Sequence, residues 1–190
     1  MTNIQINTAT QQDSDLSELY QEVIVDHARR PRFKQRPQHC QFCQEGKNPA
    51  CGDHLTIYCE VSEGCAGIVL SASFEGTGCS ISQASASIMC ERLQNVTFSQ
   101  AKEFIRHAEN VYMGKTPVSD DLQEDIEALY GVSKFPVRVK CAALAWKTFE
   151  WLLSDHFDAL GYPKQGCKNM ENVDVNCTRK LKIVSTEGHS

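Results

Sequence analysis

The chain has no apolar run that approaches the roughly 20 residues needed to span a bilayer. Its first residues, MTNIQINTATQQDSD, lack the basic-then-apolar order of a secretory signal peptide. Basic residues are in deficit, because 19 Lys and Arg stand against 24 Asp and Glu, for a formal net charge of −5. A surface for nucleic acid or anionic lipid needs clustered Lys and Arg. We therefore expect a cytoplasmic protein with no nucleic-acid partner and no membrane partner.

The chain also lacks internal repeats and any linker that would divide its 190 residues. One domain is therefore expected, and 41% hydrophobic residues are enough to build its core. We expect residues 1–13 to form a flexible tail and residues 14–160 to form the domain. Residues 161–190 are expected to be a C-terminal extension that could fold onto the domain.

Two stretches alternate between apolar and polar residues, as half-buried strands do. They cover residues 54–61 and 68–74, with Leu55, Ile57 and Val61 on one side of the first. Helical spacing of apolar residues predicts a helix over 14–30, which Pro31 ends before a loop over 31–50. Two strands alone are not stable, so a third is expected from 32–39 or from the C-terminus, where LKIV occurs.

Four further helices are predicted after the strands. A Gly-Thr-Gly turn precedes a helix over 80–93, and the Thr97–Gln100 spacing of a capping box starts another that reaches 112. A short helix follows over 120–130, and Pro136 suits the first turn of a long helix over 136–157 that Trp146 and Trp151 anchor in the core. The predicted fold class is α+β, a small antiparallel sheet of about three strands packed with about five helices.

Cysteine is abundant, with ten residues. In a reducing cytosol this number favours metal-binding or redox thiols over structural bridges. Cys59 and Cys90 occupy core positions of a strand and a helix, so they are expected to pack as small hydrophobes. His27, at the end of the first helix, is expected to be a surface or capping group.

Three cysteines stand where one element gives way to another, which is where functional side chains collect. Cys51 opens the first strand, Cys79 starts a helix and Cys141 lies in the early turns of the last helix. Asp53 is two residues after Cys51, so both side chains would point to the same side of an extended strand. Three thiolates and a carboxylate would make a four-coordinate shell suited to Zn²⁺ and acceptable to iron. The alternative is that these are ordinary buried cysteines.

The stretches NPACGDHL, FEGTGCSISQASASIM and VRVKCAALAW resemble the three cysteine motifs of the SufU/IscU/NifU N-terminal family. LYQEVIVDHARRPRF is similar to that family's first helix, and the resemblance covers about residues 15–155. It implies a fold of the SufE/IscU type, with Cys51, Asp53, Cys79 and Cys141 as the metal ligands.

Within the family, the chain looks like the SufU branch. Lys140 stands where IscU-type scaffolds carry a histidine, and FPVRVK replaces their LPPVK motif. An extra helical segment around 115–131 is similar to SufU, and Arg138 matches the SufU arginine three residues before the last cysteine.

This resemblance implies a zinc-dependent sulfurtransferase that takes persulfide sulfur from a SufS-type cysteine desulfurase and supplies downstream iron–sulfur assembly proteins. Cys51 is the preferred sulfur acceptor and Cys141 the second choice, while Arg138 would steady the freed thiolate. The first alternative is a scaffold that uses the same ligands for a transient [2Fe–2S] cluster. A structural zinc module is the second.

Four cysteines have no place in that resemblance. Cys40 and Cys43 form a CxxC in the loop before the first strand, and Cys167 and Cys177 lie beyond the family's core. Together they have the ligand number of a second zinc site. A redox or disulfide pair and free exposed thiols are the alternatives.

Overall fold

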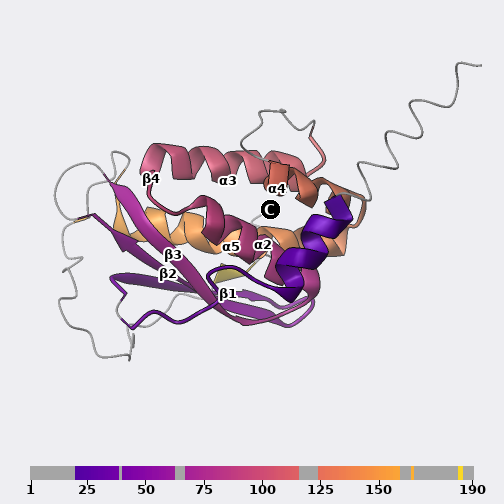
Figure 1. The fold of residues 1–190 in the computed structure, drawn as a ribbon, viewed down its shortest axis with the longest axis horizontal. Coiled ribbons are helices and arrows are strands. Elements are labelled where there is room, and N and C mark those ends of the chain that lie inside the picture. The colour runs from indigo at the N-terminus through magenta and orange to yellow at the C-terminus, as the bar shows by residue number, and fades with distance from the viewer. Residues whose placement is uncertain are drawn as a thin grey trace, which may run out of the picture.

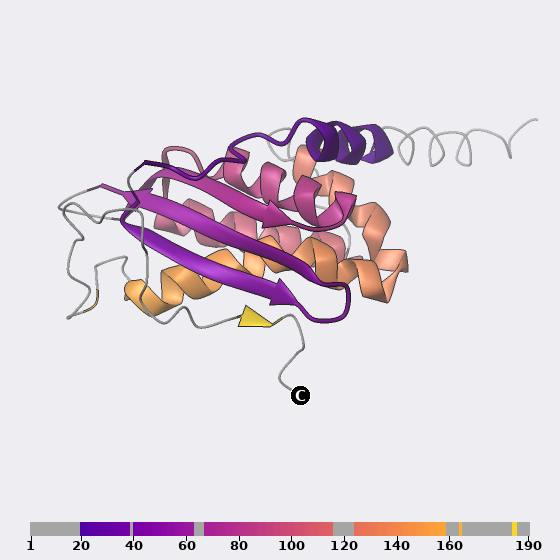
Figure 2. The ribbon, with the colours of Figure 1, turned by 90° about the horizontal axis from the view of Figure 1, so that it is seen from below.

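The computed structural model describes residues 20–38, 40–62, 67–115, 124–158, 164 and 184–185. A five-stranded sheet has the order β4-β3-β2-β1-β5. Its strands are β1 (Phe42–Asn48), β2 (Asp53–Val61), β3 (Ile68–Thr77), β4 (Val96–Thr97) and β5 (Val184–Ser185). All neighbours are antiparallel except β1 and β5, which run parallel beside each other at one edge (Figure 2).

The helices form a second layer on the sheet (Figure 1). They are α2 (Ser80–Arg92), α3 (Phe98–Tyr112), α4 (Glu124–Glu127), the 3₁₀ helix η1 (Ala128–Lys134) and α5 (Pro136–His156), and residues 20–29 are also helical. The long α5 packs on β1 and β2, while α2 packs on β3 and against α5. The core between the layers is apolar, with Leu55, Phe74 and Leu144 fully buried. The predicted α+β class is therefore confirmed.

Local signals account for the helix starts. The Thr97 hydroxyl accepts the Gln100 N–H at 3.2 Å and the Gln100 side chain accepts the Thr97 N–H at 2.9 Å, so the predicted capping box is present. Pro136 occupies the first turn of α5. Of the predicted helix over 120–130, residues 124–130 are described, and they form α4 and the start of η1.

The prediction of a loop over 31–50 is wrong for its second half, because residues 42–48 form β1. Residues 32–39 supply only an isolated bridge, Lys34 to Phe74, among the described residues. The sequence FCQEGKN has no clear apolar alternation, yet it pairs with β2 along its whole length, from Phe42 opposite Cys59 to Asn48 opposite Asp53. The sheet is therefore wider than the three strands expected. In the part of the chain that is described, no helix is long and apolar enough to cross a membrane.

His27 is only 3% exposed, so the prediction of a surface or capping group is wrong. Its Nδ1 lies 2.9 Å from Ser87 Oγ on α2, and this contact joins the first helix to the core helices. Ser87 Oγ also accepts the Arg32 backbone N–H at 2.7 Å.

We expect His27 to make stability depend on pH. Burial, helped by the Arg32 charge, lowers the pKa of His27 below its ordinary value of 6.5. The unfolded chain therefore binds the proton more readily, and stability falls as the pH drops through 6.5 towards the lower folded pKa. Guanidinium unfolding between about pH 7.5 and about pH 5.5 should show a shallower loss of stability in His27→Asn than in wild type. Equal losses in both proteins would assign the pH dependence to other groups.

Candidate metal centre

The turn between β1 and β2 places Cys51 at the tip of a hairpin. Asn48 opens the turn: its carbonyl accepts N–H groups from Cys51 at 3.3 Å and Gly52 at 2.9 Å, and its Oδ1 accepts the Ala50 N–H at 3.2 Å. Gly52 has a φ of +76°, a left-handed conformation that glycine adopts without strain. Cys51 is therefore exposed and lies in the turn, two residues before β2, the strand that it was expected to open.

Asp53 begins β2 and links it to the start of α2. The residue is 3% exposed, and its Oδ1 accepts the Cys79 backbone N–H at 2.9 Å. Cys79 Sγ lies 3.5 Å from the other carboxylate oxygen, Oδ2. The approach is close because Gly78 has no side chain: a Cβ there would lie 3.0 Å from the Asp53 carboxyl carbon. The amino end of α2 also favours negative charge at this point.

Cys141 supplies the buried side of the cluster from the second turn of α5. It is 1% exposed, and its Sγ lies 3.4 Å from Cys51 Sγ. The thiol also donates to the Val137 carbonyl oxygen at 3.6 Å, one turn earlier. The cluster thus joins an exposed thiol to a buried one.

The electrostatics favour a bound cation. Burial raises the pKa of Asp53, but hydrogen bonds from the Cys51 thiol and the Cys79 N–H outweigh it, so the carboxyl has a lowered pKa. Burial raises the pKa of both Cys51 and Cys141 above the ordinary 9.0. A carboxylate therefore faces thiols that would stay protonated near neutral pH unless a cation stabilised their ionised form.

The donor set fits such a cation. The ligand atoms of Cys51, Asp53 and Cys141 all lie within 4.8 Å of one another. Cys79 Sγ lies 3.5 Å from one member of this group, Asp53 Oδ2. Three sulfurs and one carboxylate oxygen suit Zn²⁺, which binds four such ligands, and they are also compatible with iron. The structure thus brings Cys51, Asp53 and Cys141 within reach of one ion and places Cys79 beside Asp53, and a metal shared by all four stays a prediction.

Arg138 lies three residues before Cys141, but its side chain is exposed at the start of α5. Within the described ranges, it forms no ion pair with Asp53 or any other carboxylate. A role for Arg138 beside a freed thiolate stays a prediction.

Only two of the four cysteines of the second predicted metal site, Cys40 and Cys43, are described, and they differ in state. Cys40 is free, whereas Cys43 is disulfide-bonded. A cysteine held in a disulfide offers no thiolate to a metal. Cys167 and Cys177 lie outside the described residues, so the four-cysteine site stays a prediction that requires Cys43 to be reduced.

Sequence reasoning missed Asn48. Its side-chain Nδ2 donates to Cys141 Sγ at 3.6 Å, while its backbone carbonyl shapes the Cys51 turn. The Asn-Pro pair was the available signal, because Asn at the first and Pro at the second position are typical of type I turns.

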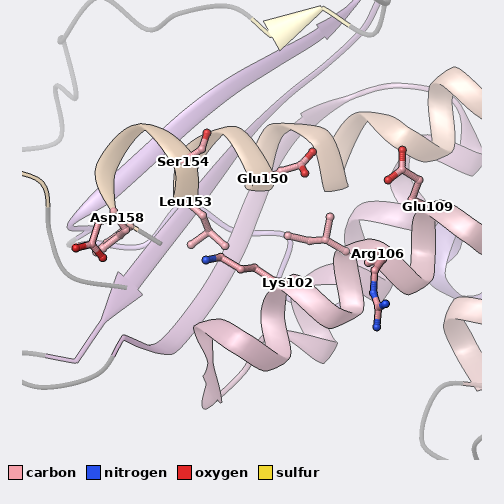
Figure 3. Close-up of a pocket in the computed structure, with 9 residues that line it drawn as sticks. Lys102, Arg106, Glu109, Glu150, Leu153, Ser154 and Asp158 are labelled. Carbon is pink, nitrogen blue, oxygen red and sulfur yellow. The ribbon is translucent and has the colours of Figure 1, made fainter. Parts of the chain in front are cut away.

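A separate groove of about 480 Å³ lies between α3 and α5 (Figure 3). None of the four clustered residues borders it. Glu109 and Glu150 on its walls share Lys147, at 3.2 and 3.3 Å. The groove is lined by Lys102, Ile105, Arg106, Glu109, Glu150, Leu153, Ser154, Phe157 and Asp158.

A two-layer α+β fold with a cysteine and aspartate cluster that could hold a metal ion defines the class of this protein. Residues 19–147 match the family described as NifU-like N terminal domain. The chain belongs to that family, as the sequence motifs indicated.

Its relatives carry two different names. The chain is 38% identical over 138 residues to the zinc-dependent sulfurtransferase SufU of Bacillus subtilis, covering 73% of this chain and 91% of that protein. It is 36% identical over 132 residues to the iron–sulfur cluster assembly scaffold protein IscU of Thermotoga maritima, covering 70% and 90%. The solved structure of FiSufU from Fervidobacterium islandicum AW-1 matches with a TM-score of 0.62 and 35% identity, over 69% of this chain and 93% of that one.

Proposed function

We propose that this protein acts in cytoplasmic iron–sulfur cluster assembly as a zinc-dependent acceptor of persulfide sulfur from a SufS-type cysteine desulfurase. Cys51, Asp53, Cys79 and Cys141 are the proposed zinc ligands. Similarity to the Bacillus subtilis sulfurtransferase supports the zinc and the reaction. Downstream assembly proteins would receive the sulfur.

The observation that carries the proposal is the contrast between two neighbouring thiols. Cys51 is exposed at a hairpin tip, where a partner's persulfide can reach it, while Cys141 is buried 3.4 Å away. Structural zinc sites usually use only Cys and His, whereas here a carboxylate stands beside an exposed thiol. This contrast favours a reactive site over a structural zinc module.

The transfer is a thiol exchange. The Cys51 thiolate attacks the terminal sulfur of the desulfurase persulfide, and a new sulfur–sulfur bond forms on Cys51. The sulfur–sulfur bond of the donor breaks, and the desulfurase cysteine leaves as a thiolate. No external oxidant or reductant is needed, because the sulfane sulfur keeps its oxidation state.

The protein's own residues prepare the acceptor. Asp53, ionised and tied to the Cys79 N–H, is a harder donor than a thiolate and leaves the site able to rearrange. Bound Zn²⁺ would supply the charge that keeps the thiols deprotonated and ready to react.

A scaffold function is the second candidate. Relatives from Thermotoga maritima and Streptococcus pyogenes are named iron–sulfur cluster assembly scaffold protein IscU, at 36% and 30% identity. The same three cysteines and Asp53 could ligate a transient [2Fe–2S] cluster. Lys140, in place of the histidine expected before the last cysteine of a scaffold, favours the sulfur acceptor.

The deciding experiment measures steady-state turnover of a SufS-type desulfurase with the zinc-loaded protein under reducing conditions. A large increase in turnover supports the sulfur acceptor. No increase, with an iron–sulfur chromophore forming when iron and sulfide are supplied, supports the scaffold. No response in either assay leaves the structural zinc module.

Asp53→Asn is expected to weaken zinc binding by about 100-fold or more. Residues that only hydrogen-bond to a metal ligand are worth about 10- to 100-fold in affinity, so loss of an ionised ligand should exceed that range. Asn keeps an oxygen that can accept the Cys79 N–H, so the fold should survive. Competition with a chromophoric chelator measures the affinity.

Glu60→Gln is the matched control, because Glu60 is an exposed carboxylate on the same strand, and it should bind zinc like wild type. Unchanged affinity in Asp53→Asn would remove Asp53 from the ligand set.

A further inference from the structure

We propose that Asn48 is a positioning residue that fixes Cys141 as the anchored thiol, so that Cys51 is the one released to accept sulfur. This inference rests on the proposed function and explains which of two adjacent cysteines reacts.

Asn48 contacts both halves of the cluster in different ways. Its backbone carbonyl accepts the Cys51 and Gly52 N–H groups, which holds the exposed turn. Its side chain points the other way, with Nδ2 donating to Cys141 Sγ at 3.6 Å. The residue is 0% exposed, and it stands opposite Asp53 at the last pair of β1 and β2.

Because Asn48 is buried, losing the hydrogen bond from its side-chain amide to Cys141 Sγ would be costly. A buried N–H that loses its acceptor is left without a partner, because water cannot reach it. Cys141 Sγ is the acceptor recorded for Asn48 Nδ2 among the described residues. Movement of Cys141 away from the cluster would therefore leave the buried Asn48 N–H donor without that acceptor.

The same bond favours Cys141 as the thiolate that stays. Hydrogen bonds to an ionised acceptor are shorter and stronger than those between neutral groups. An N–H donor directed at sulfur also occupies a lone pair that would otherwise attack an electrophile. Cys51 is exposed, so water can replace any contact that it loses on leaving the site. The two thiols therefore differ in the ease of release, and Asn48 contributes the difference.

Asn48→Asp separates the two contacts. An aspartate keeps an oxygen for the Ala50 N–H and the same backbone carbonyl, so the Cys51 turn is retained. The ionised carboxylate has no hydrogen to donate to Cys141 Sγ. Gln41→Glu is the matched control, because Gln41 Oε1 also accepts a backbone N–H, from Val61 at 2.7 Å, and the same amide-to-acid change there lies away from both thiols.

Two readouts test the inference. One is the sulfur-to-metal charge-transfer band of the Co²⁺-loaded protein, which reports hydrogen bonding to the thiolates without any desulfurase. The other is the distribution of sulfur between Cys141 and Cys51, measured by mass spectrometry after a single turnover with a persulfidated desulfurase. Asn48→Asp is expected to shift the band and raise the Cys141-to-Cys51 ratio by about tenfold, the scale of one hydrogen bond. Gln41→Glu should match wild type in both.

An unshifted band together with an unchanged ratio would overturn the role of Asn48. If wild type accepts no sulfur at all, the proposed function fails, while the Co²⁺ band still decides on Asn48. If Asn48→Asp does not fold, Asn48→Ser replaces it. The serine hydroxyl can accept the Ala50 N–H in the turn, but the serine side chain is too short to reach Cys141.

Discussion

Replacing Cys51 by serine is expected to reduce desulfurase turnover in the presence of this protein to that of the desulfurase alone. The thiolate is the nucleophile in sulfur exchange, and a serine hydroxyl is not ionised at neutral pH. Cys51 is also the exposed thiol of the cluster, whereas Cys141 is 1% exposed and cannot meet a partner's persulfide without rearrangement. Steady-state alanine or sulfide production measures the effect.

Cys40→Ser is the control for that experiment. Cys40 is also a free cysteine, it is partly exposed, and it lies outside the cluster. This variant should stimulate the desulfurase like wild type. Stimulation by Cys51→Ser at the wild-type level would show that Cys51 is not the acceptor.

Replacing Trp146 by alanine is expected to lower the free energy of unfolding by about 3–5 kcal/mol, the range for a buried aromatic cut to alanine. Trp146 is fully buried, and its Nε1 donates to Ser85 Oγ on α2 at 3.0 Å. Ser85 in turn donates to the Ala142 carbonyl of α5 at 2.6 Å. This network joins α5, which carries Cys141, to α2, which follows directly after Cys79, so zinc affinity should fall with stability.

Trp151→Ala is the matched control, because Trp151 lies on the same helix but is 40% exposed. Its loss should cost about 1 kcal/mol or less in a denaturant titration, as is usual for changes near the surface. Similar losses for both variants would mean that α5 is not held by the Trp146 network.

Much of the fold could be predicted because local signals and tertiary packing agree. The alternation of Leu55, Ile57 and Val61 predicted β2, since every second side chain enters the core. The Thr97–Gln100 box and Pro136 marked the starts of α3 and α5 to within a residue. In each case the residue that gives the signal also makes the contact.

The parts that were missed depend on partners far away in the sequence. β1 has few apolar residues at alternate positions, and it is a strand because β2 pairs with it. Trp151 was expected in the core together with Trp146, but the two side chains leave the helix at different angles and only one faces α2. His27 was expected at the surface, and its burial follows from Ser87, 60 residues later.

The cluster was predictable because its members are residue types with distinctive chemistry at the ends of elements. Cys51, Cys79 and Cys141 come from three separate elements, and only the sequence motifs around them indicated that they meet. The local geometry was less accessible: Cys51 was expected to open the strand, whereas the turn that Asn48 and Gly52 form puts it at an exposed tip. That exposed position distinguishes Cys51, the proposed acceptor, from the other thiols of the cluster.

The central claim is that Cys51 receives sulfur, and one measurement tests it directly. The zinc-loaded, reduced protein is mixed with a persulfidated desulfurase for a single turnover, and the sulfur is located by mass spectrometry of its peptides. The account predicts one added sulfur on the peptide that contains Cys51, and none in the Cys51→Ser variant. Sulfur found only on another cysteine, or none on the protein while the desulfurase persulfide stays intact, would contradict it.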